Sequence, residues 1–249
     1  MQDQVRHLET AQDGMSAASA RWARLHAEPP PAVAIDRLRL DLQVASAEYD
    51  YREAARSEQV AVYALASDPS LEQDVLRSLS AGRQAGMSQA VDGVRAVWRL
   101  AGYTDVSTIR PRRTRRFAAA EPVDTLLRYY KAAAARVGID WTYLAAINYI
   151  ESGFGRNPGR SSAGALGPMQ FLPSTWAQYG GGGDVMDPHD AIEGAATFLR
   201  RNGAPADYDR ALLHYNPDTD YAAAVQGFAA AMRADPTWLN RLYCWSTYG

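Results

Sequence analysis

The chain is short of cysteine, lysine and long apolar runs, and each shortage excludes a class of protein. Cys244 is the only cysteine, so the chain can form neither an internal disulfide nor a thiolate metal cluster. We expect Cys244 to be a small, partly buried residue. Lys131 is the only lysine, and the formal net charge of -2 gives no general basic surface. Nucleic acid is therefore not expected as a partner.

Segments that would enter or cross a membrane are also missing from the sequence. The start, MQDQVRHLETAQDGM, lacks the basic residues followed by an apolar run that a secretory signal needs. The longest uncharged stretch, residues 161–183, is rich in Gly, Ser and Pro and cannot be a membrane span. If the protein works outside the cytoplasm, either a signal has been removed or export follows another route.

Residues 1–103 have the pattern of a helical arm or bundle. Apolar residues repeat at steps of three and four up to the prolines of Glu28–Pro31, at Leu8, Ala11, Met15, Ala18, Trp22 and Leu25. A second stripe follows at Ile35, Leu38, Leu42, Ala45 and Tyr49. The two stripes predict antiparallel helices joined at the prolines. A further helix is expected with Met87, Val91, Val94 and Trp98 on its inward side.

Residues 104–120 read as an arginine-rich linker between two parts of the chain. Five arginines surround a proline, at Arg110, Arg112, Arg113, Arg115 and Arg116. A solvated linker is one interpretation. The other is a tether for an anionic wall polymer, because clustered arginines release counterions when they bind polyphosphate. Interleaved aromatic residues, which would stack on bases, are absent from this stretch.

Residues 121–249 are punctuated as a second, all-α domain. Pro122, Pro173 and Pro188 stand where helices begin, and Gly138 stands where one ends. Candidate N-caps precede other helices, at Asp68, Asp140, Asp187, Asp207, Asp218 or Thr219, and Asp235. No strand pairs with hairpin turns are evident.

One carboxylate in this domain occupies an unusual place. In the helix from Trp141, Leu144, Ile147 and Glu151 lie on the same side, so Glu151 borders the apolar stripe at the helix C-terminus. Burial and the partial negative charge of the last carbonyls both disfavour the ionised form of Glu151. A carboxyl that stays protonated near neutral pH is what a general acid requires. The bland alternative is a glutamate that only closes a helix.

Two later segments strengthen the catalytic interpretation. GALGPMQFLPSTW (164–176) places Gln170 in a loop of small residues, and LLHYNPDTDY (212–221) ends a helix at Tyr215 and Asn216. With "ES" at Glu151 and Ser152, and in this order and spacing, they resemble the catalytic domain of lytic transglycosylases. Pro168 and His214 depart from the usual pattern, and QFLPSTW is similar to membrane-bound B-type enzymes and their actinobacterial relatives.

The resemblance implies a fold, a substrate and a set of roles. The fold would be the one shared with goose-type lysozymes, and the substrate bacterial peptidoglycan, without metal or organic cofactor. Glu151 would be the single general acid and base, and Tyr215 would hold it. The other site residues would contact the glycan: Ser152, Met169, Gln170 and Asn216.

The reaction implied is cleavage between N-acetylmuramic acid and N-acetylglucosamine with a 1,6-anhydro end on the muramic acid. Two alternatives stay open. A lysozyme-like hydrolase needs a second carboxylate, for which Asp184, Asp187, Asp190 and Glu193 are candidates. A non-catalytic wall-binding module of a phage tail or secretion apparatus would need no acid at position 151. Peptidoglycan places the protein outside the cytoplasmic membrane, and the partner of the helical arm is not specified by the sequence.

Delivery of the protein is a separate expectation. Tyr49 and Glu53 have the spacing of a type VII export signal, and the hairpin weakly resembles a secretion arm. The tryptophan-glycine turn that is usual in such hairpins is absent.

Overall fold

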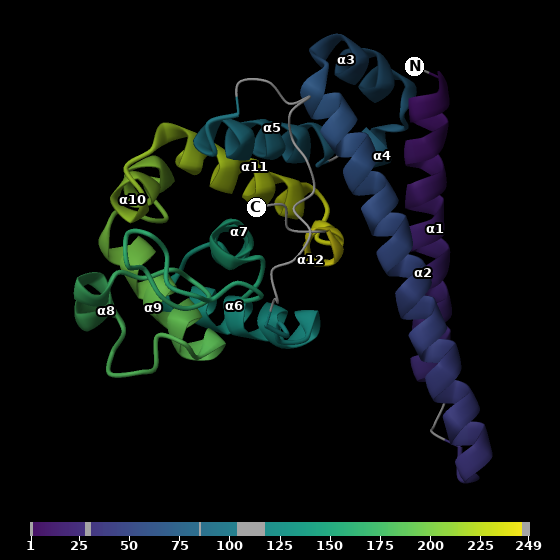
Figure 1. The fold of residues 1–249 in the computed structure, drawn as a ribbon, viewed down its shortest axis with the longest axis horizontal. Coiled ribbons are helices and arrows are strands. Elements are labelled where there is room, and N and C mark those ends of the chain that lie inside the picture. The colour runs from purple at the N-terminus through teal and green to yellow at the C-terminus, as the bar shows by residue number, and fades with distance from the viewer. Residues whose placement is uncertain (1, 28–30, 85, 104–117, 246–249) are drawn as a thin grey trace. The chain divides into compact units, whose positions relative to one another are not determined.

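The computed structural model describes residues 2–27, 31–84, 86–103 and 118–245, and the regular structure in these ranges is helical (Figure 1). The all-α prediction is therefore confirmed. One isolated bridge, between Leu166 and Phe171, is the only extended pairing recorded for these ranges. The linker arginines, Arg110 to Arg116, lie outside the described residues.

The helices follow one another along the chain with short connections. Their bounds are α1 Gln2–Ala27, α2 Ala34–Ser67, α3 Pro69–Ser78, α4 Ala81–Gln84, α5 Met87–Leu100, α6 Val123–Val137, α7 Trp141–Ser152, α8 Pro173–Tyr179, α9 Pro188–Arg201, α10 Tyr208–Tyr215, α11 Thr219–Ala234 and α12 Trp238–Cys244. None of the helices in the described ranges is both long enough and apolar enough to span a membrane.

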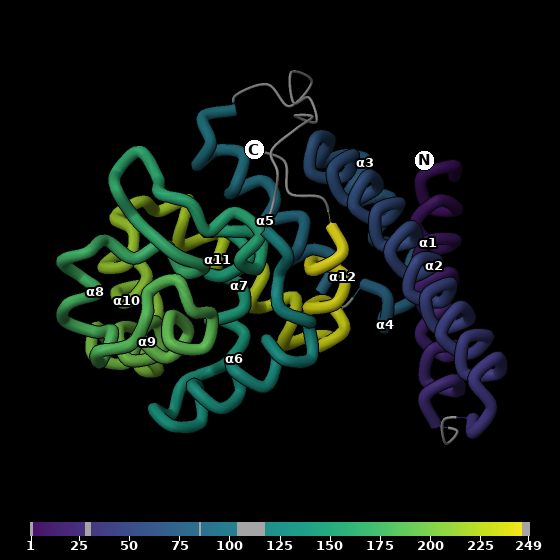
Figure 2. The backbone as a smooth tube through the Cα atoms, turned by 60° about the horizontal axis from the view of Figure 1, so that its bottom comes forward, coloured from purple at the N-terminus to yellow at the C-terminus, as the bar shows by residue number. Residues whose placement is uncertain are grey.

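The chain forms two compact units. The first runs to Ala81 and also takes in Cys244 and Trp245, while the second runs from Gly82 to Tyr243. The sequence-based boundary at residue 103 placed α5 with the helical arm. In the structure α5 packs along α11 in the second unit (Figure 2). Gly227 permits this contact, because a Cβ there would lie 2.8 Å from the Gln89 carbonyl oxygen.

Helices α1 and α2 form the expected antiparallel hairpin of the first unit. The Gln12 side chain donates to the Glu58 carboxylate across it at 3.2 Å. Among the buried and half-buried residues of α2, one series repeats at steps of three and four: Leu40, Val44, Ala47, Tyr51, Ala54, Glu58, Ala61 and Leu65. This heptad-like spacing is typical of helices that pack along one another.

The inward stripe expected on α2 was the wrong one. Ile35, Leu38, Leu42 and Tyr49 are exposed, Leu42 by 64%. Helix α1 instead packs on the side of α2 that carries Ala54, where a Cβ on Gly14 of α1 would lie 3.3 Å from the Ala54 side chain. The stripe on the other side of α2 is therefore left exposed.

Helix α7 is the central element of the second unit and contacts α6, α9 and α11 (Figures 1 and 2). Leu144 and Ile147 are fully buried, as their stripe predicted. The predicted inward side of α5 is buried as well. The side chain of Asp140 accepts from the Thr142 N–H at 3.0 Å and begins α7.

Other predicted helix starts are also confirmed. The side chains of Asp68, Asp187, Asp207 and Asp218 cap α3, α9, α10 and α11. Asp235 accepts from the Thr237 N–H at 3.0 Å just before α12. Cys244 is partly buried and forms no disulfide, as expected.

Candidate active site

Glu151 lies in the last turn of α7, next to Gly153, which ends the helix in the left-handed conformation with φ 59°. The residue keeps part of its surface exposed. Its carboxyl is nevertheless shielded from water, and this burial raises the pKa of Glu151 to about 7. At neutral pH the group is therefore divided between its acid and base forms, which suits a residue that must both give and take a proton.

Tyr221, in the first turn of α11, is the polar neighbour of the Glu151 carboxyl. Its hydroxyl acts on Glu151 as a donor and lowers the pKa, against the larger effect of burial. Within the described ranges this hydroxyl has no partner at ordinary hydrogen-bond geometry. The contact with Glu151 is therefore longer or less well aligned than a normal hydrogen bond, and only 1% of Tyr221 is exposed. In the sequence, Tyr221 was considered only for stacking on sugars or for core packing.

Tyr215 lies at the end of α10, close enough to Glu151 for the carboxylate charge to raise the tyrosine's pKa further, after burial has raised it. Its hydroxyl, however, donates to the Met169 carbonyl at 2.7 Å. Tyr215 was expected to hold Glu151, and the structure gives its hydroxyl a different partner. The bond instead fixes the loop 164–171 against the end of α10.

Ser152 is buried and fully engaged. Its hydroxyl donates to the Pro168 carbonyl at 2.6 Å and accepts from the Gly155 N–H at 2.8 Å. Ser152 was expected to contact the glycan, but only 3% of it is exposed. Its hydrogen bonds connect the end of α7 to the loop 164–171, so Ser152 positions the site from its buried side.

Asn148 also connects α7 to the loop 164–171, and this residue was not predicted from the sequence. Its amide nitrogen donates to the Pro168 carbonyl at 2.8 Å, and its amide oxygen accepts from the Tyr130 hydroxyl at 2.5 Å. The sequence did contain a signal for Asn148, because this amide lies one turn before Glu151 and its neighbours in the helix are mostly apolar. A buried amide in such a place needs partners, which the loop supplies.

The loop 164–171 holds Gln170 in a strained conformation. Gln170 has a positive φ of 50°, which non-glycine residues rarely adopt. Its amide nitrogen donates to the carbonyls of Gly159 and Gly167, at 3.1 and 2.9 Å. No hydrogen bond recorded for the described residues uses its amide oxygen, which is therefore available to accept from a bound molecule.

The remaining predicted site residues differ in exposure. Met169 is fully buried, so its side chain does not line an open floor, and its carbonyl serves Tyr215 instead. Asn216 follows α10 with an extended backbone and is half-buried. The structure thus brings Glu151, Tyr215 and Tyr221 together, and places Met169 beside them.

Each of the four candidate second carboxylates has another partner, three of them within the local structure at the start of α9. Asp187 caps the helix, as expected, and Asp184 accepts from the Met186 N–H at 2.8 Å. Asp190 accepts from the Asp184 N–H at 2.9 Å, and Glu193 pairs with Arg136. The pKa of Glu151 is raised by burial and lowered by the Tyr221 hydroxyl. No second carboxylate of the described residues is among the causes of its shift.

A group of three side chains at the same helix start has ligand atoms within 4.8 Å of one another, namely Asp187, His189 and Asp190. These residues are mostly exposed, and two of them already accept backbone N–H groups. His189 also packs its ring edge-on against Tyr129. These contacts are those of an ordinary helix N-terminus, and we assign the group no part in the chemistry.

One known family matches the part of the chain that contains α7, the loop 164–171 and helices α8 to α10. Residues 128–219 match the transglycosylase SLT domain. The match begins within α6 and ends at the first residue of α11, so it contains Glu151, Gln170 and Tyr215. No solved structure matches the chain.

The SLT match supports the resemblance to lytic transglycosylases and the lysozyme-like fold of this region. SLT-domain proteins are peptidoglycan-cleaving enzymes, which supports an enzymatic role at the level of the family. It also agrees with action on glycan strands outside the cytoplasm. The B-type, actinobacterial character of QFLPSTW stays a prediction.

Proposed function

We propose that the protein is a peptidoglycan lytic transglycosylase in which Glu151 is the single general acid and base. The observation that carries the proposal is the burial of the Glu151 carboxyl at the end of α7, which raises its pKa to about 7. Near neutral pH a substantial fraction of the molecules holds the proton that the leaving oxygen needs. After transfer, the same carboxylate can accept a proton.

In the proposed reaction Glu151 protonates the oxygen between N-acetylmuramic acid and N-acetylglucosamine. The substrate's own 2-acetamido group stabilises the cationic centre as that bond breaks. Glu151 then removes the proton of the muramic 6-hydroxyl, whose oxygen closes on the anomeric carbon. The product ends in 1,6-anhydro-muramic acid, and the enzyme returns to its starting protonation state.

The surroundings of Glu151 support a mechanism with one carboxyl. Glycosidases with two carboxylates hold them about 5 to 9.5 Å apart, and the four acids considered for that role instead serve the start of α9 or pair with Arg136. We assign direct contacts with the glycan to the amide groups of Gln170 and Asn216. Ser152, Asn148 and Met169 position the loop that carries Gln170.

The remaining parts of the chain receive proposals as well. We assign catalysis to residues 121–249, a linking role to 104–120, and a role as an arm to the hairpin within 1–103. The site of action is the cell wall, reached by a cleaved signal or by another export route. An anionic wall polymer at Arg110 to Arg116 would hold the enzyme at its substrate.

The test is mass spectrometry of the soluble products from purified peptidoglycan treated with the wild type, Glu151→Gln and Glu48→Gln. Glu48 is an exposed glutamate of α2 and serves as the matched control. We expect anhydro-muropeptides from the wild type and the control. Glu151→Gln should release them about 10²- to 10⁴-fold more slowly. Reducing-end products would contradict the proposal in favour of a hydrolase. If the wild type released nothing, a binding module would be the better account.

A further inference from the structure

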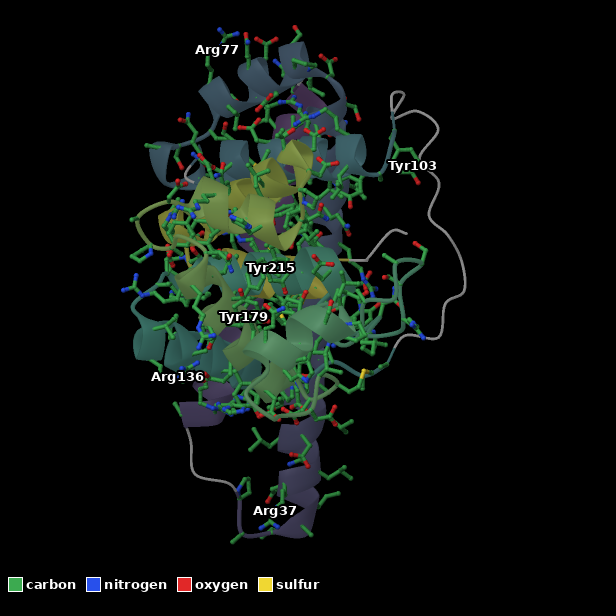
Figure 3. The ribbon with its side chains drawn as sticks, turned by 90° about the vertical axis from the view of Figure 1, so that its left-hand side faces the viewer. Arg37, Arg77, Tyr103, Arg136, Tyr179 and Tyr215 are labelled. Atoms are coloured by element: carbon green, nitrogen blue, oxygen red, sulfur yellow. The ribbon has the colours of Figure 1, made fainter. Side chains whose placement is uncertain are left out.

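A polar groove runs along α9. It has a volume of about 350 Å³, which is within the range of sites for small molecules. Helices α6, α8 and α9 and the glycine loop 180–183 form its walls. Its lining includes Arg136, Gln178, Tyr179, Asp190, Glu193 and Arg201. Arg136 and Tyr179 are labelled in Figure 3.

The groove has opposite charges at its two ends. Asp190 lies in the first turn of α9 and Arg201 is its last residue. The eleven steps from Asp190 to Arg201 correspond to about 16 Å along a helix. A fully extended peptide covers about 3.3 to 3.6 Å per residue, so four or five residues match this length.

Several groups in the groove are not used by the fold. Arg136 is committed, because it donates to the Glu193 carboxylate and to Thr197. Arg201, by contrast, lies over the ring of Tyr179 at 5.8 Å and makes no hydrogen bond or ion pair recorded in the described ranges. The Gln178 side chain and the Gly181 N–H likewise have no recorded hydrogen bond there. Arg201 is therefore available for an anion at its end of the groove, and the Gln178 amide and the Gly181 N–H are further unused donors in the lining.

The acidic end is charged at neutral pH. The Asp184 N–H, followed by the His189 side chain, lowers the pKa of Asp190. Asp190 is therefore an ionised acceptor that an ammonium group can approach from solvent. Together with Arg201 it gives the groove the charge distribution that complements a zwitterion.

The groove is close to the proposed catalytic site. Tyr179 packs against Phe198 with ring centroids 4.8 Å apart, and Phe198 packs against Tyr215 at 5.0 Å. Tyr215 lies near Glu151 and holds the Met169 carbonyl. Two aromatic side chains, Phe198 and Tyr215, therefore connect the groove wall at Tyr179 with Glu151.

We propose that this groove binds the peptide stem of peptidoglycan, with a stem carboxylate at Arg201 and a free amino group near Asp190. The inference rests on the proposed function, because the glycan strand that reaches Glu151 carries such peptides on its muramic acid residues. A bound stem would then fix the position of its sugar relative to Glu151. Peptide-bearing strands would be cut faster than strands without peptides.

The first experiment measures binding of the synthetic peptide L-Ala-γ-D-Glu-L-Lys-D-Ala by NMR titration, independently of catalysis. We expect shifts at the amides of Gly180, Gly181 and Gly183, and binding about tenfold weaker for Arg201→Ala. Amidation of the peptide's terminal carboxylate should weaken binding to the wild type and have little further effect on Arg201→Ala. Arg210→Ala, an exposed arginine outside the groove, is the control and should bind as the wild type does. Equal affinity of Arg201→Ala and the wild type would overturn the inference.

The second experiment compares cleavage of peptidoglycan with cleavage of glycan strands from which an amidase has removed the peptides. We expect the wild type and Arg210→Ala to cleave the peptide-bearing strands faster than the bare strands. In Arg201→Ala the ratio of the two rates should be about tenfold smaller. An unchanged preference in Arg201→Ala overturns the inference but leaves the transglycosylase proposal standing. Peptide binding that depends on Arg201 in a protein that cuts neither substrate refutes the proposed function and keeps the groove as a peptide site.

Discussion

Helices α2 and α7 both carry an apolar stripe at helical spacing but have opposite environments. Eight of the twelve residues of α7 are buried, against eight of the thirty-four of α2, so only α7 is enclosed on most sides. The stripe of large apolar residues on α2 is exposed, whereas Leu144 and Ile147 of α7 are fully buried. An apolar stripe at helical spacing therefore predicted the buried side of α7, which has helices on several sides, but not that of α2.

The same difference acts on carboxylates. Glu53 of α2 pairs with Arg56 one turn later at 2.7 Å, and both side chains are about half exposed. Glu151 of α7 has no such partner among the described residues, and burial raises its pKa to about 7. A glutamate in water is an ordinary surface charge, and a glutamate at the end of an enclosed helix becomes an acid that works near neutral pH.

Matched leucine substitutions should show the largest contrast. Leu144→Ala in α7 should lower the free energy of unfolding by about 2 to 5 kcal/mol, because it leaves a cavity in the core. Leu42→Ala in α2 should change it by at most about 0.5 kcal/mol, since Leu42 is 64% exposed. Chemical denaturation followed by circular dichroism measures both. A large loss from Leu42→Ala would mean that the outer side of α2 is covered in solution.

Titration of Glu151 should make stability depend on pH. Because its folded pKa of about 7 lies above the unfolded value of 4.5, the folded state binds more protons between these values, and stability falls as pH rises through this range. Full ionisation costs about 3 kcal/mol by the usual conversion. Glu151→Gln should therefore be more stable than the wild type at pH 8, with the gain disappearing near pH 4.

Thermal or chemical unfolding at several pH values measures this effect. Glu48→Gln in α2 is the control and should have a small effect at both ends of the range, because its charge stays in water. If Glu151→Gln and the wild type had parallel stability profiles, Glu151 would not be buried in the folded protein.

The two tyrosines near Glu151 should differ in a smaller effect. Tyr221→Phe removes the hydroxyl that lowers the Glu151 pKa, so the pH profile of glycan cleavage should move upward by about half a unit to one unit. Tyr215→Phe removes the bond to the Met169 carbonyl. Its main effect should be a stability loss of about 1 kcal/mol, with a smaller shift of the profile. The reverse order would show that Tyr215, as first expected, holds Glu151.

The smallest effect is expected at the surface pair of α2. Arg56→Ala removes its contact with Glu53 and should change the free energy of unfolding by less than about 0.5 kcal/mol at moderate salt. Raising the salt concentration should reduce the difference further. A change above about 1 kcal/mol would place Arg56 in a contact beyond this pair.

Local signals predicted much of the fold. Asp68, Asp140, Asp187 and Asp218 cap the helices that they were expected to cap, because an N-cap depends only on neighbouring N–H groups. The place of Glu151 beside an apolar stripe also followed from spacing within one helix. Packing between helices was harder to predict from the sequence, because partners such as α5 and α11 are more than a hundred residues apart in the chain.

Within the site, the partners of the polar side chains could not be read from the sequence. Ser152 and Asn148 both bond to the Pro168 carbonyl, and Tyr215 bonds to the Met169 carbonyl. Main-chain carbonyls have no identity in the sequence, so these contacts depend on where the loop 164–171 lies. The resemblance named the residues of the site, and the loop decides which of them can reach a substrate.

By itself the sequence determined that the protein is helical, where most helices begin and end, and that one glutamate borders an apolar stripe before a glycine. These properties depend on residues within a few positions of one another. The tertiary structure alone decided which stripe of α2 is exposed, that Tyr221 faces Glu151, and that a charged groove follows α9. Each of these depends on residues that are distant in the chain, because burial and contact are properties of the space that several helices enclose.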